Sequence, residues 1–174
     1  SSAPAASPPA VDRADFGIGT QQQPAQDAPV AVAIAAVGLD LAVVPVGVRV
    51  DGQMEIPTLV TEVGWYRHGP APGAAQGSAV LSAHVDSELG RAPMAALFDV
   101  ELGAIVEITT ASGAVLTFRV EQIEQLGKQQ LPLDALFARD GAPVLRLVTC
   151  AGDWDPAAGA YDDNLIVTAT PVTG

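Results

Sequence analysis

Cys150 carries the most reactive side chain in this sequence, and it is the only cysteine of the chain. It ends the apolar run Val-Leu-Arg-Leu-Val-Thr-Cys and is followed by the turn-rich segment Ala-Gly-Asp-Trp-Asp-Pro. This pattern predicts a thiol at the end of a β-strand, beside a loop, where a rigid scaffold can hold a reactive group at solvent. A lone cysteine also fits a small buried hydrophobic residue, and position alone leaves that alternative open.

His84 is the candidate partner of this thiol, because it closes a second apolar run, Ser-Ala-Val-Leu-Ser-Ala-His. An unperturbed thiol, with a pKa of about 8.5, is only slightly ionised near neutral pH, and an imidazolium partner stabilises its thiolate. One cysteine and one histidine are the minimum set for acyl transfer, and we expect the pair to titrate as a coupled unit. His68, the other histidine, lies in a Pro/Gly-rich loop and is predicted at the surface. A histidine held within the core or at a strand edge remains the alternative for His84.

Acyl transfer also needs a donor for the oxyanion that develops on the attacked carbonyl. The strand predicted after Cys150 begins at Asn164 and contains no arginine. Asn164 is therefore the candidate donor, through its side-chain amide. Arginines elsewhere in the chain could reach the site in space, and the candidates are Arg91, Arg119 and Arg146.

Metal and cofactor sites are not indicated by the residue pattern. Two histidines and one cysteine are too few for a closed zinc site without carboxylates, and no His-x-x-x-His or Cys-x-x-Cys spacing occurs. Four carboxylates bracket one loop without the spacing of an EF-hand, which favours a solvated acidic loop: Asp153, Asp155, Asp162 and Asp163. No glycine-rich phosphate loop opens a helix. The sequence therefore predicts no metal and no cofactor.

Composition limits the class of protein and its partners. The 174 residues are 49% hydrophobic and only 5% aromatic, which predicts one domain with a core of aliphatic side chains. A formal net charge of -12 disfavours binding to nucleic acid or to an anionic membrane surface. The longest apolar stretch, residues 30–50, is interrupted by Gly, Asp and Pro and carries Arg49, so it is not expected to span a membrane. No signal peptide is visible, and the chain starts at Ser1.

Short apolar runs punctuated by Gly and Pro occupy the chain from residue 30 onward and predict an antiparallel barrel or sandwich. Residues 115–122 alternate, with Leu116, Phe118, Val120 and Gln122 expected on one face. Two short helices are predicted at residues 92–97 and 132–137. Residues 1–28, rich in Ala, Pro, Ser and Gln, predict a flexible linker, a membrane tether or a lid over the site, and residues 29–174 the folded domain.

Three segments together resemble the sortases, and most closely the actinobacterial class F group: VGWYRHGPAPG at residues 63–73, GSAVLSAHVDS at 77–87 and LVTC at 147–150. The likeness covers residues 30–172. It implies a mainly β fold, a closed eight-stranded antiparallel barrel with one or two short helices. It also implies an extracytoplasmic enzyme at the bacterial cell surface, anchored to the membrane by a segment absent from this chain.

The resemblance further implies a cysteine transpeptidase that cleaves Leu-Pro-x-Thr-Gly-type sorting signals and holds the acyl chain as a thioester. It then transfers that chain to an amine of a cell-wall precursor or a pilin. By position, Cys150 matches the family nucleophile and His84 the general acid for the leaving amine. Thr149 matches the residue that helps to position the substrate and its oxyanion.

The sequence departs from the family pattern at Asn164, which aligns with the position where sortases generally have an arginine. This departure motivates an alternative, a catalytically impaired sortase-like module that binds peptides at the cell wall. A third reading, a cell-wall L,D-transpeptidase, is weaker because the Ser-His-Gly-Cys type of segment of that family is absent.

Overall fold

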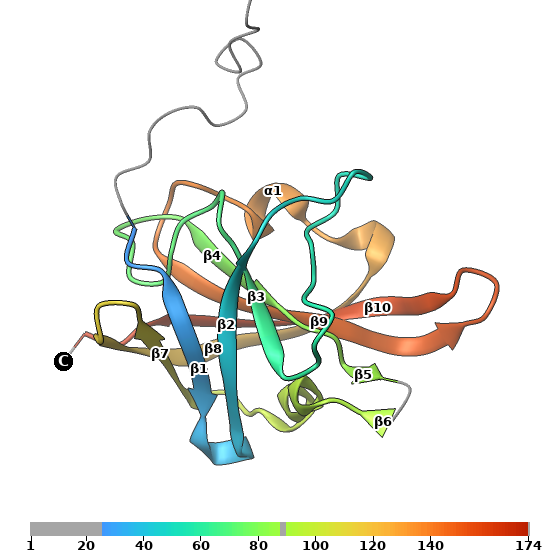
Figure 1. Cartoon of the computed structure of the whole chain (residues 1–174), viewed down its shortest axis with the longest axis horizontal. Helices are drawn as coiled ribbons and strands as arrows, with labels where there is room; N and C mark the ends of the chain where they lie inside the picture. The colour runs from blue at the N-terminus through green and yellow to red at the C-terminus, as the bar shows by residue number, and fades with distance from the viewer. Residues whose placement is uncertain (1–25, 88–89, 174) are drawn as a thin grey trace, which may run out of the picture.

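The centre of the molecule is a closed barrel of eight β-strands (Figure 1) in a computed structural model that describes residues 26–87 and 90–173. The strands follow one another around the barrel in the order β1, β2, β3, β4, β9, β10, β8 and β7, and β7 pairs with β1. Their bounds are β1 Pro29–Ile34, β2 Leu39–Val46, β3 Glu62–Tyr66, β4 Ser78–Ser82, β7 Ile105–Thr110, β8 Val115–Gly127, β9 Val144–Asp155 and β10 Ala160–Pro171. The mainly β barrel expected from the sequence is confirmed.

Two pairs of neighbouring strands are parallel, β2 with β3 and β4 with β9, whereas the other neighbours in the barrel run antiparallel. The barrel is therefore mainly antiparallel, as the resemblance implies, and departs from that arrangement only at these two pairs. Parallel strands end at the same edge of a sheet. The end of β4 at Ser82 consequently lies beside Val148 of β9, so that the two candidate catalytic segments are neighbours.

Side chains alternate along each strand, so one face of every strand points into the barrel, and these inner side chains form the core. In β9, Leu145, Leu147 and Thr149 are buried, whereas Arg146, Val148 and Cys150 are only half-buried. Burial of each fully enclosed Leu, Ile or Val side chain contributes roughly 1.5–3 kcal/mol relative to exposure. Packing of the inner residues thus fixes which side chains of β9 face outward, and Cys150 is one of them.

The alternation expected along residues 115–122 holds for Phe118 and Val120, which are buried, and fails at Gln122, which is exposed. The pairing with β10 explains the failure. Val120 pairs with Ala169 and Gln122 with Thr168, so that Glu121 is an extra residue in the ladder. A bulge of this kind changes the face to which the following side chains point.

Strand β9 is longer than the sequence indicated. The apolar run was expected to stop at Cys150, but β9 continues to Asp155 and pairs with β10 in a hairpin that extends beyond the barrel (Figure 1). The end of β9 and the turn that follows it, residues 152–159, are exposed, so this part of the hairpin does not need an apolar run. Cys150 therefore lies within a strand rather than at its end.

Short helices and one small hairpin lie outside the eight strands of the barrel. The helix expected at residues 92–97 is a 3₁₀ helix, η3 (Pro93–Asp99), with proline in its first turn, and the one expected at 132–137 is the helix α1 (Leu133–Leu136). Two further 3₁₀ turns are η2 (Ala35–Val37) and η4 (Lys128–Gln130). Strands β5 (Asp86–Ser87) and β6 (Gly90–Arg91) pair with each other outside the barrel.

The start of the described chain contacts the barrel through three consecutive residues. The Gln26 amide donates to the carbonyl of Gly69, Asp27 accepts from the backbone N–H of Ser112, and the carbonyl of Ala28 accepts from Ala111. The predicted linker, tether or lid otherwise falls on residues 1–25, which lie outside the described residues.

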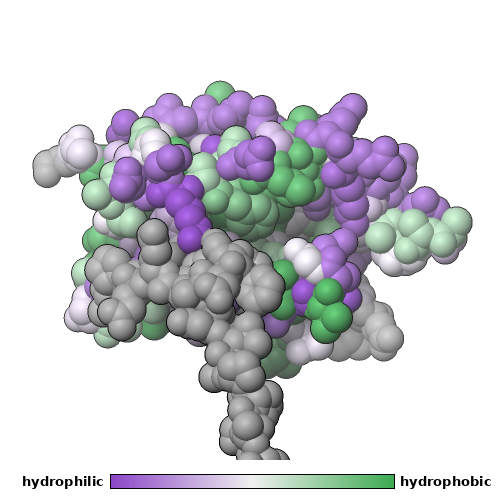
Figure 2. All heavy atoms as spheres, turned by 90° about the horizontal axis from the view of Figure 1, so that it is seen from above, coloured by the Kyte–Doolittle hydropathy of each residue, from purple (hydrophilic) through white to green (hydrophobic). Residues whose placement is uncertain are grey.

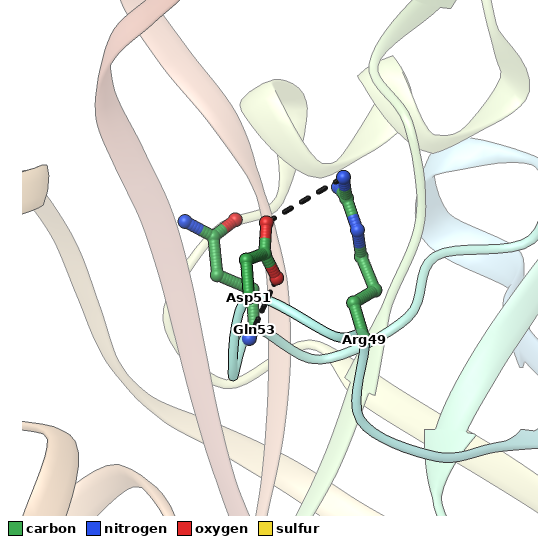
Figure 3. Close-up of polar contacts among 3 residues, drawn as sticks. All are labelled: Arg49, Asp51 and Gln53. Carbon is green, nitrogen blue, oxygen red and sulfur yellow. Dashed lines mark hydrogen bonds and ion pairs between the residues drawn. The ribbon is translucent and has the colours of Figure 1, made fainter.

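The surface of the barrel carries exposed polar turns. In the connection between β2 and β3, Arg49 pairs with Asp51 at 3.5 Å, and Asp51 also accepts from the backbone N–H of Gln53 (Figure 3). An exposed ion pair of this kind contributes little to stability. Figure 2, which looks from above on the side that carries α1, shows hydrophilic residues around an apolar area. No helix among residues 26–87 and 90–173 has the length and apolar character needed to cross a membrane.

Candidate active site

The candidate site begins at the contact between β4 and β9, which we call the β4–β9 seam (residues 78–84 and 144–150). The hydroxyl of Ser82 donates to the carbonyl of Val148 at 3.0 Å, and the hydroxyl of Thr149 donates to the carbonyl of Ala83 at 2.9 Å. His84 follows Ala83 and Cys150 follows Thr149. The seam therefore brings the backbones of His84 and Cys150 next to each other, although 66 residues separate them in sequence.

Asn164 lies on the other side of Cys150. The two residues are direct partners in the antiparallel pairing of β9 with β10, and both are half-buried. Directly opposed residues of an antiparallel pair point to the same face of the sheet. The amide of Asn164 consequently projects from the barrel on the same side as the Cys150 thiol, while Thr149 faces the core.

Burial and two charged side chains, Asp86 and Lys128, determine the electrostatic surroundings of the thiol. Burial raises the pKa of Cys150, the nearby carboxylate of Asp86 also raises it, and the ammonium of Lys128 lowers it. Burial has the largest effect because it removes water from around the thiolate. The folded protein thus holds Cys150 mainly as the neutral thiol near neutral pH, and a base must remove its proton before it can attack.

A small cavity of about 130 Å³ lies beside the thiol, and we call it the thiol-side cavity. Cys150 forms part of its wall. The other lining residues are Val85, Asp86, Arg91, Phe98, Ala151, Gly152 and Tyr161. Asp86 and Arg91 come from the hairpin of β5 and β6, and Tyr161 comes from β10, so two segments distant in sequence meet at this cavity.

Tyr161 is held in place at the cavity by two contacts. Its hydroxyl donates a hydrogen bond to the carboxylate of Asp86, and its ring packs edge-on against Trp154, with centroids 5.2 Å apart. The bond to Asp86 is the main reason why the pKa of Tyr161 is raised, since ionisation would remove the donor proton. Asp86 is therefore positioned by a neutral phenol rather than by a cation.

Gly152 makes the turn that takes the chain away from the thiol. Its φ of +80° is in the left-handed region, and a Cβ there would lie 2.8 Å from a carboxylate oxygen of Asp163. The ladder between β9 and β10 shifts register at this point, between the pairs Ala151 with Asp163 and Trp154 with Tyr161. A bulge with a left-handed glycine thus interrupts the regular pairing after Ala151, one residue beyond Cys150.

Sequence reasoning named Cys150, His84, Asn164 and Thr149, and the structure brings all four together around the end of the seam. Of the three arginines considered, Arg91 lines the thiol-side cavity, whereas Arg119 lies on β8 opposite Thr170. Arg146 lies on β9 four residues before Cys150, where burial lowers its pKa.

Three groups near the thiol were not assigned a role from the sequence: Asp86, Lys128 and Tyr161. Two weak signals could have pointed to them. Asp86 is part of the His-Val-Asp segment, and Lys128 is the only lysine of the chain. Their proximity to Cys150 depends on the pairing of β5 with β6 and of β8 with β10, which the sequence pattern does not specify.

A second cavity and possible metal-binding side chains were the other candidates for a functional site. A larger apolar cavity of about 480 Å³ is lined by residues 70–76 and Leu116, among others, but not by Cys150 or His84. Within the described part of the chain, no group of three or more His, Cys, Asp or Glu side chains is arranged to hold a metal ion.

A barrel that holds a thiol beside an imidazole-bearing segment defines a candidate cysteine acyltransferase. The model of the sortase domain matches residues 32–172, so the chain belongs to the sortase family. Membership implies cysteine transpeptidase activity on sorting-signal substrates and amine nucleophiles. Sortases are cell-surface enzymes and are generally anchored to the membrane. No curated protein matches the chain.

Solved sortase structures share the fold. Sortase C1 from Streptococcus suis is 19% identical, with a TM-score of 0.62, and the match covers 84% of this chain and 73% of that one. Sortase C from Clostridium perfringens is 18% identical, with a TM-score of 0.60, over 85% of this chain and 71% of that one. Sortase A from Corynebacterium diphtheriae is also 18% identical, with a TM-score of 0.60, over 86% and 63% of the two chains.

Proposed function

We propose that the protein is a sortase of the actinobacterial class F type that cleaves Leu-Pro-x-Thr-Gly sorting signals and joins the released acyl group to an amine. The observation that carries this proposal is the hydrogen bond from Thr149 to Ala83, since it holds the segments of Cys150 and His84 together. The Gly-Trp-Tyr, His-Val-Asp and Val-Thr-Cys segments support the class assignment.

In the proposed mechanism, His84 takes the proton of the Cys150 thiol, whose raised pKa makes an acceptor necessary. The sulfur attacks the threonine carbonyl of the sorting signal and forms a tetrahedral oxyanion. As the oxyanion collapses, the bond to glycine breaks and His84 donates its proton to the leaving amine. The acyl chain then remains on Cys150 as a thioester.

Asn164 and Thr149 assist this step in the proposal. Asn164 projects on the same face as the thiol and donates a hydrogen bond to the oxyanion in place of an arginine. Thr149 orients the backbone around the nucleophile through its buried hydroxyl. An uncharged amide stabilises an oxyanion less than a guanidinium does, so we expect a slow enzyme.

The proposed setting is the outer surface of a bacterial cell, where the chain attaches secreted proteins to a cell-wall precursor or joins pilin subunits. A segment outside this chain would anchor the protein to the membrane. The substrates on both sides of the reaction are peptides, and the proposal requires no cofactor.

Cleavage of a fluorogenic Leu-Pro-x-Thr-Gly peptide, with and without an added amine, tests the proposal. We expect cleavage and an amine-linked product from the unmodified chain and neither from Cys150→Ala. Val115→Ala, which truncates an exposed side chain of β8 outside the seam, serves as the matched control and should retain cleavage. Equal cleavage by the protein and by Cys150→Ala would contradict the proposal.

The second candidate is a peptide-binding module without catalysis, favoured by Asn164 at the place where the family has an arginine. Such a module would bind the sorting-signal peptide and leave it intact. Calorimetric titration of the folded protein with the peptide, followed by mass analysis of that peptide, separates the two candidates. Binding without cleavage, together with cleavage by Asn164→Arg, would support the module.

A further inference from the structure

The thiol-side cavity carries two opposite charges that the proposed mechanism does not use. Asp86 and Arg91 are direct partners in the pairing of β5 with β6, and both line the cavity next to Cys150. No ion pair joins their side chains in the described part of the chain. The guanidinium of Arg91 instead stacks over the ring of Phe98, 5.5 Å from its centroid.

Each of the two charges is held in place but keeps capacity for a ligand. Asp86 accepts a hydrogen bond from the Tyr161 hydroxyl, and a carboxylate offers about four lone-pair positions in all. Stacking on Phe98 leaves the edge of the guanidinium, with its N–H donors, available for a planar anion. A ligand with an amine and a carboxylate close together would satisfy both residues.

We propose that this cavity binds the acceptor, and that Asp86 and Arg91 select an amine whose neighbouring carbon carries a carboxylate. Arg91 binds the carboxylate through paired hydrogen bonds, and Asp86 accepts from the amine. The volume of about 130 Å³ is room for a small head group, roughly the share of four water molecules in the liquid. This inference rests on the proposed function, because it names the second substrate of the same site.

The charges also suit the chemistry of transfer. The neutral amine attacks the thioester carbonyl, a C–N bond forms, the C–S bond breaks and its electron pair returns to the sulfur of Cys150. The attacking nitrogen becomes positive, which the carboxylate of Asp86 stabilises, and its surplus proton passes to neutral His84. Water offers no carboxylate to Arg91, so the pair of residues favours transfer over hydrolysis.

Competition between two acceptors tests the inference. The protein receives the donor peptide with equal concentrations of glycine, which has the carboxylate, and ethylamine, which lacks it, and the two products are quantified by mass spectrometry. Arg91→Gln should lower the ratio of glycine product to ethylamine product by about tenfold to a hundredfold, and Arg91→Lys should restore part of it. Arg49→Gln, which changes an exposed arginine in another connection, should leave the ratio within about twofold of that of the unmodified chain.

A second measurement needs no donor peptide. Glycine bound in the cavity should slow the alkylation of Cys150 by iodoacetamide, ethylamine should not, and Arg91→Gln should abolish the protection. An unchanged product ratio in Arg91→Gln would overturn the inference while transfer itself still supports the proposed function. Protection by glycine without any peptide cleavage would support the cavity as a binding site and count against the proposed function. If glycine does not protect Cys150 and no peptide is cleaved, the inference is overturned.

Discussion

The β4–β9 seam differs from the charged rim around it in what holds each in place. We use the term rim for β5, β6, residues 152–161, Phe98 and Lys128. The seam is packed into the core, with Leu81 and Leu147 fully buried and Thr149 only 2% exposed. The rim is open to solvent, with Trp154 at 55% and Phe98 at 38% exposure. Packing thus determines where Cys150 and His84 are attached, whereas exposed side chains determine the charge around them.

Because of this contrast, we expect substitutions in the seam and in the rim to have different effects. Changes in the seam should affect stability and activity together, because the same buried contacts serve both. Changes in the rim should alter the ionisation of the thiol or the choice of acceptor, with little cost in stability. The four predictions below, from the largest expected effect to the smallest, test that separation.

Removal of the imidazole should have the largest effect. His84→Ala should lower peptide cleavage by a factor of about 10² to 10⁴, the usual contribution of general acid–base catalysis. His68→Ala removes the other, exposed histidine and should leave cleavage nearly unchanged. Steady-state kinetics on both variants, with circular dichroism to verify folding, provides the measurement. Similar rates for the two variants would show that the seam does not place His84 at the thiol.

Asn164→Ala should lower cleavage by about a hundredfold, the lower end of the range for losing one oxyanion donor, because its amide is neutral and half-buried. The loss should appear in kcat rather than in KM, since the oxyanion exists only in the transition state. Gln122→Ala, which removes an exposed amide from β8, is the control. A change confined to KM would assign Asn164 to peptide binding.

Thr149→Val should lower the free energy of unfolding by about 1–3 kcal/mol, because it leaves the carbonyl of Ala83 without its buried hydroxyl donor. Thr168→Val is the matched control, because it makes the same substitution at a buried threonine whose hydroxyl has no hydrogen-bond partner among residues 26–87 and 90–173. That variant should be neutral or stabilised. Urea unfolding of both variants gives the comparison, and equal destabilisation would contradict the role assigned to the seam.

Substitutions in the rim should shift the thiol pKa in opposite directions. Asp86→Asn removes a negative charge that disfavours the thiolate, so the pKa should fall and alkylation should begin at lower pH. Lys128→Gln removes a positive charge, so the pKa should rise. Each shift should be at most about one unit. The pH dependence of iodoacetamide alkylation measures both, and shifts of the same sign would contradict the electrostatic account.

The sequence was sufficient to predict the barrel and its two chemical segments, because short β-branched runs and strand-associated Cys and His are local patterns. It did not predict that β9 continues to Asp155, since this part of the strand has no apolar run and pairs only with β10. The parallel pairing of β4 with β9 could not be deduced from alternation either. Asp86, Lys128 and Tyr161 meet the thiol only through long-range pairing.

The most direct test of the central claim is the intact mass of the protein after brief mixing with the Leu-Pro-x-Thr-Gly peptide and acid quenching. The account predicts a mass increase equal to the acyl fragment, located on Cys150, labile to hydroxylamine and absent from Cys150→Ala. An unmodified mass across peptides that vary the second and third positions, from protein whose Cys150 still reacts with iodoacetamide, would contradict it.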